Sequence, residues 1–145
     1  MNNSDYIISI DGVCDKEIFF LSLLNFFAPF DVILTTWGKL PKTTLQQLSK
    51  HRVARFGLRR FLFYEFNLKL NNKSLNSILE CLCDDDILNQ IKWGIRKGGI
   101  PLALFRDWDD MYIDGSELIQ DEILFSWIDD LKAKGIIESF EKIDD

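Results

Sequence analysis

The sequence predicts an α/β or α+β fold, a single domain over residues 1–145 with roughly four to five strands and five helices. Three observations support this prediction. The chain has 145 residues, 47% of them hydrophobic, which is enough to close one core without disulfides or metals. Short β-branched or alternating runs are interspersed with longer runs that repeat an apolar residue every three or four positions. No repeat, linker or low-complexity tract divides the chain.

The first 40 residues predict a strand, a helix and a second strand. Tyr6–Ile10 is apolar and β-branched, and Asp11-Gly12 closes it as a turn. A helix follows from Asp15, a helix-capping residue, to Phe27, and its apolar residues lie nearly all round, which indicates a buried helix. Pro29 ends it. Asp31–Trp37 reads as the second strand, at a spacing that allows a parallel pair with the first.

The middle of the chain predicts a short helix over Thr44–His51 and a strand over Arg60–Leu70. In that strand Leu62, Tyr64, Phe66, Leu68 and Leu70 share one face. A helix capped by Ser74 then runs to Cys83.

The later segments are more acidic. Asp84-Asp85-Asp86 is expected to open a helix that ends at Arg96-Lys97 before Gly98-Gly99, because acids favour a helix start and glycine a helix end. A short strand is expected over Ile100–Phe105. A long helix over Glu117–Lys134, capped by Ser116 or Asp114, and a final edge strand over Ile136–Phe140 complete the fold.

Charge is distributed unevenly along the chain. The net charge is −6. Residues 1–31 hold five acids and one base, residues 32–106 hold thirteen bases and five acids, and residues 107–145 hold thirteen acids and three bases. Folding therefore either pairs the basic middle with the acidic end or leaves two opposed patches.

The stretch Phe105–Gly115 is the main candidate for a contact surface, because it sets two large aromatics among four aspartates. Tryptophan and tyrosine supply large contact areas, and carboxylates complement a cationic partner. The predicted partner-binding residues are Asp107, Trp108, Asp109, Asp110, Tyr112, Asp114, Glu117, Asp121 and Glu122. The alternative is that Trp108 and Tyr112, four residues apart, simply pack into the core.

No catalytic or cofactor signature is present in the sequence. His51 is the only histidine and lies in a basic stretch, and Gly98-Gly99 lacks the spacing of a phosphate-binding loop. Cys14, Cys81 and Cys83 form an odd, unpatterned set that is expected to stay reduced. We therefore expect no metal, no cofactor and no enzymatic activity. An enzyme with an unrecognised carboxylate site remains an alternative.

The basic segment Lys39–Arg60 supports a second alternative, a nucleic-acid-associated regulator. It carries seven bases and no acid, interleaved with apolar residues, a composition that can follow a phosphate backbone. The candidate contacts are Lys50, Arg52, Arg55, Arg59 and Arg60. A stretch of this size is more often a solvated face, so nucleic acid is the less favoured partner.

The first fifty residues resemble the barstar-type immunity fold. The resemblance rests on Tyr6–Gly12, the helix from Asp15 to Phe27, Trp37-Gly38, and a second helix with Leu45 and Leu48. More broadly, a small acidic domain is similar in character to bacterial toxin-immunity proteins. Inhibitors of the barstar type place acids after the glycine, where this chain has Lys39 and Lys42, so no inhibitory residue is carried over.

These observations favour a non-catalytic immunity or antitoxin-type inhibitor that covers a basic toxin, such as a nuclease, with an acidic and aromatic surface. The longest apolar run, Ile18–Leu21, is too short to span a bilayer, and the N-terminus has no basic region typical of a signal peptide. A cytoplasmic bacterial protein without membrane contact is the expectation. The oligomeric state is left open.

Overall fold

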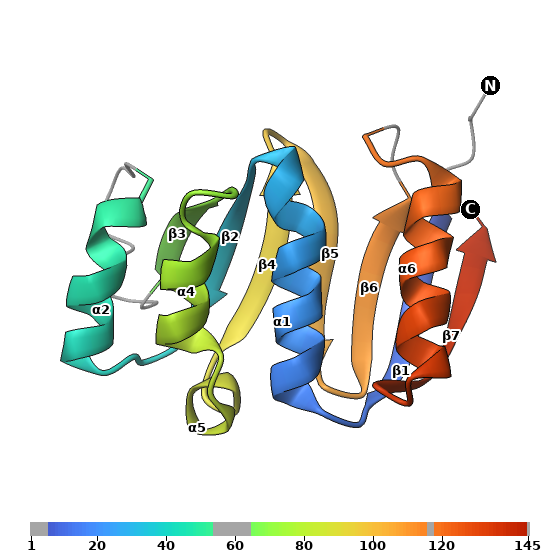
Figure 1. Ribbon diagram of the computed structural model, residues 1–145, viewed down its shortest axis with the longest axis horizontal. Helices are drawn as coiled ribbons and strands as arrows, with labels where there is room; N and C mark the ends of the chain where they lie inside the picture. The colour runs from blue at the N-terminus through green and yellow to red at the C-terminus, as the bar shows by residue number, and fades with distance from the viewer. Residues whose placement is uncertain (1–5, 54–64, 116–117, 145) are drawn as a thin grey trace.

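The computed structural model describes residues 6–53, 65–115 and 118–144, and these are organised around one seven-stranded sheet (Figure 1). The spatial order of the strands is β3-β2-β4-β5-β6-β1-β7, and every neighbouring pair is antiparallel. The strands are β1 (Tyr6–Val13), β2 (Val32–Trp37), β3 (Glu65–Leu70), β4 (Lys92–Lys97), β5 (Ile100–Asp107), β6 (Asp110–Gly115) and β7 (Ile137–Asp144).

The α-helices of the described segments lie together on one face of this sheet (Figure 1). They are α1 (Lys16–Phe27), α2 (Lys42–Leu48), α4 (Leu75–Leu82), α5 (Asp85–Leu88) and α6 (Asp121–Ala133). Two short 3-10 turns, η1 (Ala28–Phe30) and η2 (Ser49–His51), follow α1 and α2. The chain is thus of the α+β class, with five α-helices in its described part as the sequence predicted. The predicted strand number was wrong: the sheet has seven strands rather than four to five.

The largest departure from the sequence prediction lies between Asp84 and Gly99. The expected long helix stops after α5, and β4 begins at Lys92. Trp93 and Ile95 both enter the core from alternate positions of β4, whereas a helix would have had to accommodate Gly94 in its interior. Gly98, with φ +59°, lies at the turn between β4 and β5, so the glycine pair makes a hairpin and does not end a helix.

The second departure concerns Phe105–Gly115, which forms the β5–β6 hairpin. Trp108 and Asp109 occupy its turn, and Tyr112 lies on β6, so the two aromatics are not on one helical face. Asp114 also lies on β6, and Gln120 is the residue at the start of α6, so the expected cap by Asp114 was wrong.

The first two strands are not neighbours, although the sequence allowed a parallel pair. β1 pairs with β6 and β7, while β2 pairs with β3 and β4. Three strands, β4, β5 and β6, separate them in the sheet. The chain passes from β1 to β2 through α1, which lies over the middle of the sheet and runs along the strand direction (Figure 1).

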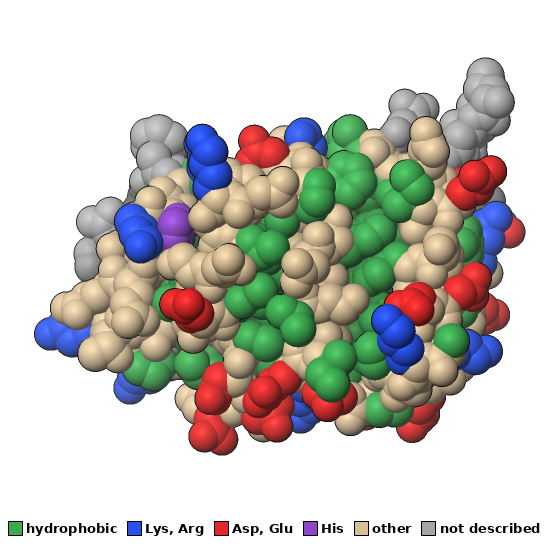
Figure 2. Space-filling model, in the orientation of Figure 1, with side chains coloured by type: hydrophobic (Ala, Val, Ile, Leu, Met, Phe, Trp, Pro, Cys, Tyr) green, Lys and Arg blue, Asp and Glu red, His purple; other side chains and the backbone are tan. Residues whose placement is uncertain are grey.

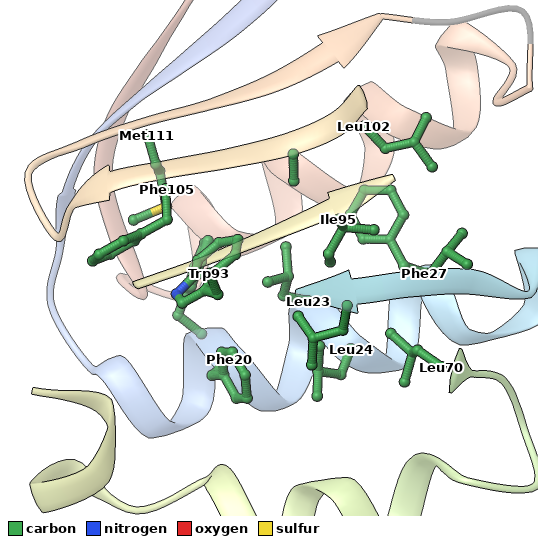
Figure 3. Packing of buried hydrophobic residues seen from close by; sticks show 14 of the residues in the cluster. Phe20, Leu23, Leu24, Phe27, Leu70, Trp93, Ile95, Leu102, Phe105 and Met111 are labelled. Atoms are coloured by element: carbon green, nitrogen blue, oxygen red, sulfur yellow. The ribbon is translucent and has the colours of Figure 1, made fainter. Parts of the chain in front are cut away.

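The core lies between the sheet and the helix layer, with α1 near its centre. Phe20, Leu23, Leu24 and Phe27 of α1 point at Trp93 and Ile95 of β4 (Figure 3), and all six are fully or almost fully buried. The other side of α1 contacts α6, where Trp127 stacks on Phe26 with ring centres 4.3 Å apart. Contacts on these two sides account for most of the apolar residues of α1, but Ile18 and Leu21 remain exposed, so the helix is not buried all round as the sequence predicted.

Several local predictions are confirmed. Asp15 caps α1 by accepting a hydrogen bond from the Ile18 amide at 3.0 Å. β7 is an edge strand, and within β3 the even-numbered residues Phe66, Leu68 and Leu70 are buried. The part of the predicted strand that precedes Glu65 lies outside the described residues. Among the described residues, no helix combines the length and apolar character needed to cross a bilayer.

Candidate functional site

Trp108, the expected aromatic anchor, packs against the core and is only partly exposed. Its ring lies at 4.9 Å from Phe105 and 6.4 Å from Phe19, both in edge-to-face geometry, and at 6.4 Å from Trp93. The Nζ atom of Lys16 lies 5.8 Å from the ring centre. The indole therefore stabilises the hairpin against α1 and the sheet, so the core alternative describes Trp108 but not Tyr112.

The carboxylates of the same turn face solvent. Asp107 and Asp109 are exposed, and the Asp109 amide donates a hydrogen bond to Asp107 Oδ1 at 2.8 Å. Asp110 lies 3.9 Å from the Arg106 guanidinium, a pair with both side chains largely exposed. Such an exposed pair contributes little to stability. The turn thus presents exposed carboxylates on either side of the partly buried Trp108 ring.

The remaining predicted residues are divided between two other places. Tyr112 and Asp114 lie on β6 with their side chains on the face of the sheet opposite the helices, where burial raises the pKa of Asp114. Asp121 and Glu122 lie at the start of α6, and Asp121 accepts a hydrogen bond from the Tyr6 hydroxyl at 2.5 Å. Glu117 lies outside the described residues. The predicted set therefore does not form one continuous surface.

The fold instead gathers acids from three segments at one end of the molecule. We call this surface the acidic end; its members are Asp15, Glu17, Asp84, Asp85, Asp86, Asp107 and Asp109. All seven are exposed, and none forms an ion pair with a lysine or arginine of the described segments. Acidic side chains gather along the lower edge in Figure 2, below α5 and the start of α1.

Hydrogen bonds tie the three segments of the acidic end together. The Val13 amide donates to the Trp108 carbonyl at 3.1 Å, which joins the end of β1 to the hairpin turn. The Asp85 amide donates to Glu17 Oε2 at 3.0 Å, and Lys16 Nζ donates to Asn89 Oδ1 at 2.5 Å, which joins α1 to α5. The position of each acidic segment is therefore set by hydrogen bonds to its neighbour.

Apolar side chains are exposed on α1 directly beside the acidic end. Ile18 is 46% exposed and Leu21 44% exposed. Further along the helix layer, Phe26, Ile123 and Trp127 line a shallow hollow of about 550 Å³ with Glu122 and Asp130 at its margin. Figure 2 shows hydrophobic side chains running between the helices above the acidic edge. A surface with an apolar centre and a charged rim is typical of protein–protein interfaces.

Sequence reasoning identified Asp15 and Asp84–Asp86 only as helix caps. Both assignments are correct, since Asp84 accepts hydrogen bonds from the Asp86 and Ile87 amides. Their membership in a larger acidic surface depends on contacts between residues about 70 positions apart. The sequence shows acidic turns alternating with apolar runs, but this pattern does not indicate which of the acidic turns lie side by side in the folded chain.

Only part of the basic segment proposed to contact nucleic acid lies among the described residues. Lys50 and Arg52 lie with Lys69 and Lys73 around a hollow of about 560 Å³ beside β3. Arg52 also stacks on Phe66 at 4.3 Å. Burial, and then the nearby Lys50, lower the pKa of His51 in this hollow. Arg55, Arg59 and Arg60 lie outside the described residues, so the structure gives the positions of only Lys50 and Arg52 among the five predicted contacts.

The described segments contain no group of three histidine, cysteine, aspartate or glutamate side chains arranged to hold a metal ion. The three cysteines are free thiols, with Cys81 buried and Cys14 exposed. Comparison of the chain with family models, curated proteins and solved structures gave no match.

Proposed function

We propose that this chain is a non-catalytic binding protein of the immunity or antitoxin type, which blocks a basic toxin by covering it. The observation that supports the proposal is the acidic end, where seven exposed carboxylates converge from the β5–β6 turn, the start of α1 and α5. The resemblance to barstar-type proteins supports the same class but contributes no residue to this surface.

The seven carboxylates of the acidic end are exposed to solvent, and none is ion-paired within the described segments. Because these carboxylates are not neutralised by lysines or arginines of the described segments, they produce a negative electrostatic potential in the surrounding solvent. Such a field accelerates encounter with a cationic partner by about 10- to 1,000-fold at low salt. A nuclease domain is a suitable partner, because a protein that binds a polyanionic substrate carries a basic surface.

Short-range affinity would come from the apolar residues beside the acids. Ile18 and Leu21 expose large apolar areas one turn from Asp15 and Glu17. Burial of exposed aliphatic side chains contributes about 25 cal/mol per Å². Trp108 takes a supporting role, since its indole holds the acidic turn against α1. In this proposal the acids steer the partner, and α1 retains it.

The decisive experiment measures association with the product of the neighbouring gene. Coexpression and copurification test whether the two proteins form a complex. The separately purified proteins are then mixed in stopped-flow experiments from about 50 to 500 mM salt. The expected association rate falls by about tenfold or more over this range, because screening weakens the steering field. Asp86→Asn combined with Asp109→Asn should slow association at low salt while leaving dissociation almost unchanged.

The matched control is Asp129→Asn combined with Glu138→Gln, which removes the same number of negative charges at exposed positions of α6 and β7. This control should associate nearly as fast as the parent. A second pair, Ile18→Ser and Leu21→Ser, should instead accelerate dissociation. The proposal fails if the neighbouring product does not bind, or if it binds at a rate that ignores salt.

The nucleic-acid alternative is supported by the hollow ringed by Lys50, Arg52, Lys69 and Lys73. A gel-shift assay at low salt with single- and double-stranded DNA and RNA tests it. Retention that falls with a Lys69→Gln and Lys73→Gln variant would favour this function, because each lost phosphate contact reduces the salt dependence of binding. A lack of retention at low salt dismisses it.

A further inference from the structure

The face of the sheet opposite the helices is covered by none of the described elements (Figure 1). We call it the open face. A sheet with one solvated face normally alternates apolar residues inward with polar residues outward. Here large apolar side chains also point outward: Leu104 of β5 is 51% exposed, Trp37 of β2 is 37% exposed and Ile143 of β7 is 41% exposed. Trp37, Pro101 and Leu104 line one hollow on this face, and a contiguous exposed apolar patch of this kind indicates a contact surface.

The strand register defines which residues lie side by side on the open face. One row crosses the whole sheet with Leu104 of the central strand at its middle: Asn67, Thr35, Gly94, Leu104, Tyr112, Ser9 and Glu141. In the next row on one side, Arg96 pairs with Ile33, and Asp114 pairs with Ile7. In the next row on the other side, Lys92 pairs with Trp37, and Asp110 lies two residues from Tyr112 on β6.

Charge on the open face is divided by the central strand β5. On the β4 side the row residues include Arg96 and Lys92, and the outer strand β3 adds Lys69. On the β6 side they include Asp110 and Asp114, and the outer strand β7 adds Glu141. Two charges depart from this division. Glu65 lies on the basic half, where it accepts hydrogen bonds from Trp37 and Asn67, and Arg106 of β5 lies 3.9 Å from Asp110 of the acidic half. The open face therefore carries opposite charges at equal distances from its middle strand.

A hollow of about 260 Å³ lies on the basic half, next to Leu104. Gly94 contributes to its floor, and the Trp37 ring lies about 3.6 Å from the position that a Gly94 Cβ would take. The indole is held in place because its Nε1 donates to Glu65 Oε1 at 3.2 Å. In the same row, at the same distance from β5 on the acidic half, stands the large side chain of Tyr112. Large and small residues are thus placed symmetrically about β5.

We propose that the open face binds a second copy of this chain, about a two-fold axis that runs parallel to the strands at β5. The open face adjoins the acidic end at the β5–β6 turn but lies on the side of the sheet opposite the helices, so this inference goes beyond the proposed function. Such an axis lays β4 of one copy over β6 of the other and keeps each row over the same row. The β5 strands of the two copies then meet at the centre.

The residues brought together by this axis are complementary. Arg96 faces Asp114 of the second copy, and Lys92 faces Asp110 of the second copy. Tyr112 of the second copy enters the hollow beside Gly94 and Trp37. Leu104 meets its own equivalent on the axis. Because the axis repeats every contact, each complementary pair occurs twice in the interface.

A two-fold axis across the strands would give the opposite result. It would place Arg96 over Lys92 of the second copy and Asp114 over Asp110, so like charges would meet on both halves. Juxtaposed like charges disfavour an interface strongly. The charge pattern therefore selects one orientation. The Asp114 carboxylate supports this choice, because it is half-buried and no side chain of the described segments donates a hydrogen bond to it.

The open face is large enough for a dimer contact. Seven strands of about six residues cover an area of roughly 30 Å by 20 Å. Two such faces reach the lower part of the range for specific protein interfaces, about 1,200 Å² in total. At this size complementarity decides affinity, so exchanging charges provides the sharpest test.

The first experiment is sedimentation equilibrium on the purified chain without any partner. The expected result is a monomer–dimer equilibrium. Arg96→Glu alone and Asp114→Arg alone should each raise the dimer dissociation constant by about tenfold or more, because each creates two like-charge contacts. The double variant Arg96→Glu/Asp114→Arg should restore dimerisation, since the swapped charges face each other again. Lys73→Glu, a reversal in the turn after β3, is the control and should leave the dimer unchanged.

The second experiment tests the axis by cysteine crosslinking. Leu104→Cys should form a disulfide-linked dimer under mild oxidation, because the two side chains meet on the axis. Ile123→Cys has nearly the same exposure, 48% against 51%, but lies on α6 in the helix layer and should not crosslink. A chain that stays monomeric at all concentrations overturns the proposal. So does a double charge swap that fails to restore the dimer, or equal crosslinking of both cysteines.

Discussion

Replacing Trp108 by alanine tests directly whether its indole belongs to the core or to a binding surface. The ring contacts Phe19, Trp93 and Phe105, and Lys16 lies over its face. Truncation of a buried tryptophan costs about 3–5 kcal/mol, and well-oriented aromatic pairs add to the area term. Because the side chain is only partly buried, we expect a loss near the lower limit, about 3 kcal/mol.

The measurement is urea unfolding followed by far-ultraviolet circular dichroism, together with a thermal scan. A loss of 3 kcal/mol corresponds to a fall in Tm of about 6–12 °C for a chain of this size. The matched control is Trp37→Ala on the open face, which should cost about 1 kcal/mol or less, since that indole is 37% exposed and lies outside the core. If Trp108→Ala leaves stability within about 0.5 kcal/mol of the parent, the aromatic cluster does not hold the hairpin.

Three further predictions follow from single contacts. Asp84→Ala should cost about 1 kcal/mol in urea unfolding, because it removes the cap of α5, whereas Asp86→Ala should cost much less; equal losses would contradict the capping role. Burial raises the pKa of Asp114, so the native state keeps that proton while the unfolded chain loses it, and stability falls as pH rises through this window. Asp114→Asn should therefore stabilise the dilute monomer at pH 7 and lose this advantage below about pH 4, and an advantage that is independent of pH would refute the assignment. Burial raises the pKa of the Cys81 and Cys83 thiols, with Glu80 and Glu17 adding to it, so iodoacetamide should label both more slowly at pH 7 than exposed Cys14; mass spectrometry would detect the reverse order.

Helices and strands could be predicted from the sequence where neighbouring residues all favoured the same structure. The run Tyr6–Ile10 predicted β1, and Asp15 followed by an apolar stretch predicted α1 together with its cap. The segment after Asp84 was misread because Ile87, Leu88, Ile91 and Ile95 fit a helical spacing as well as a short helix followed by a strand. A short apolar run does not distinguish these two structures, and here the glycines and Trp93 decide in favour of the strand.

Of the three segments that form the acidic end, only the β5–β6 hairpin was predicted from the sequence as a binding surface. The sequence showed that Asp107 and Asp109 lie among aromatics, but it could not show that Trp108 turns inward while the carboxylates turn outward. It also could not show that Tyr112 and Asp114 point to the other side of the sheet, because that depends on the strand period of two and on the register with β1.

The sequence by itself determined the charge of the chain, its alternation of apolar and acidic segments, and most helix and strand positions, since these depend on residues within a few positions of each other. Only the tertiary structure decided which acids meet at one end, and which charges lie at equal distances from β5 on the open face. Both depend on the order of the strands, which brings together residues far apart in the chain and is set by the packing of the whole core.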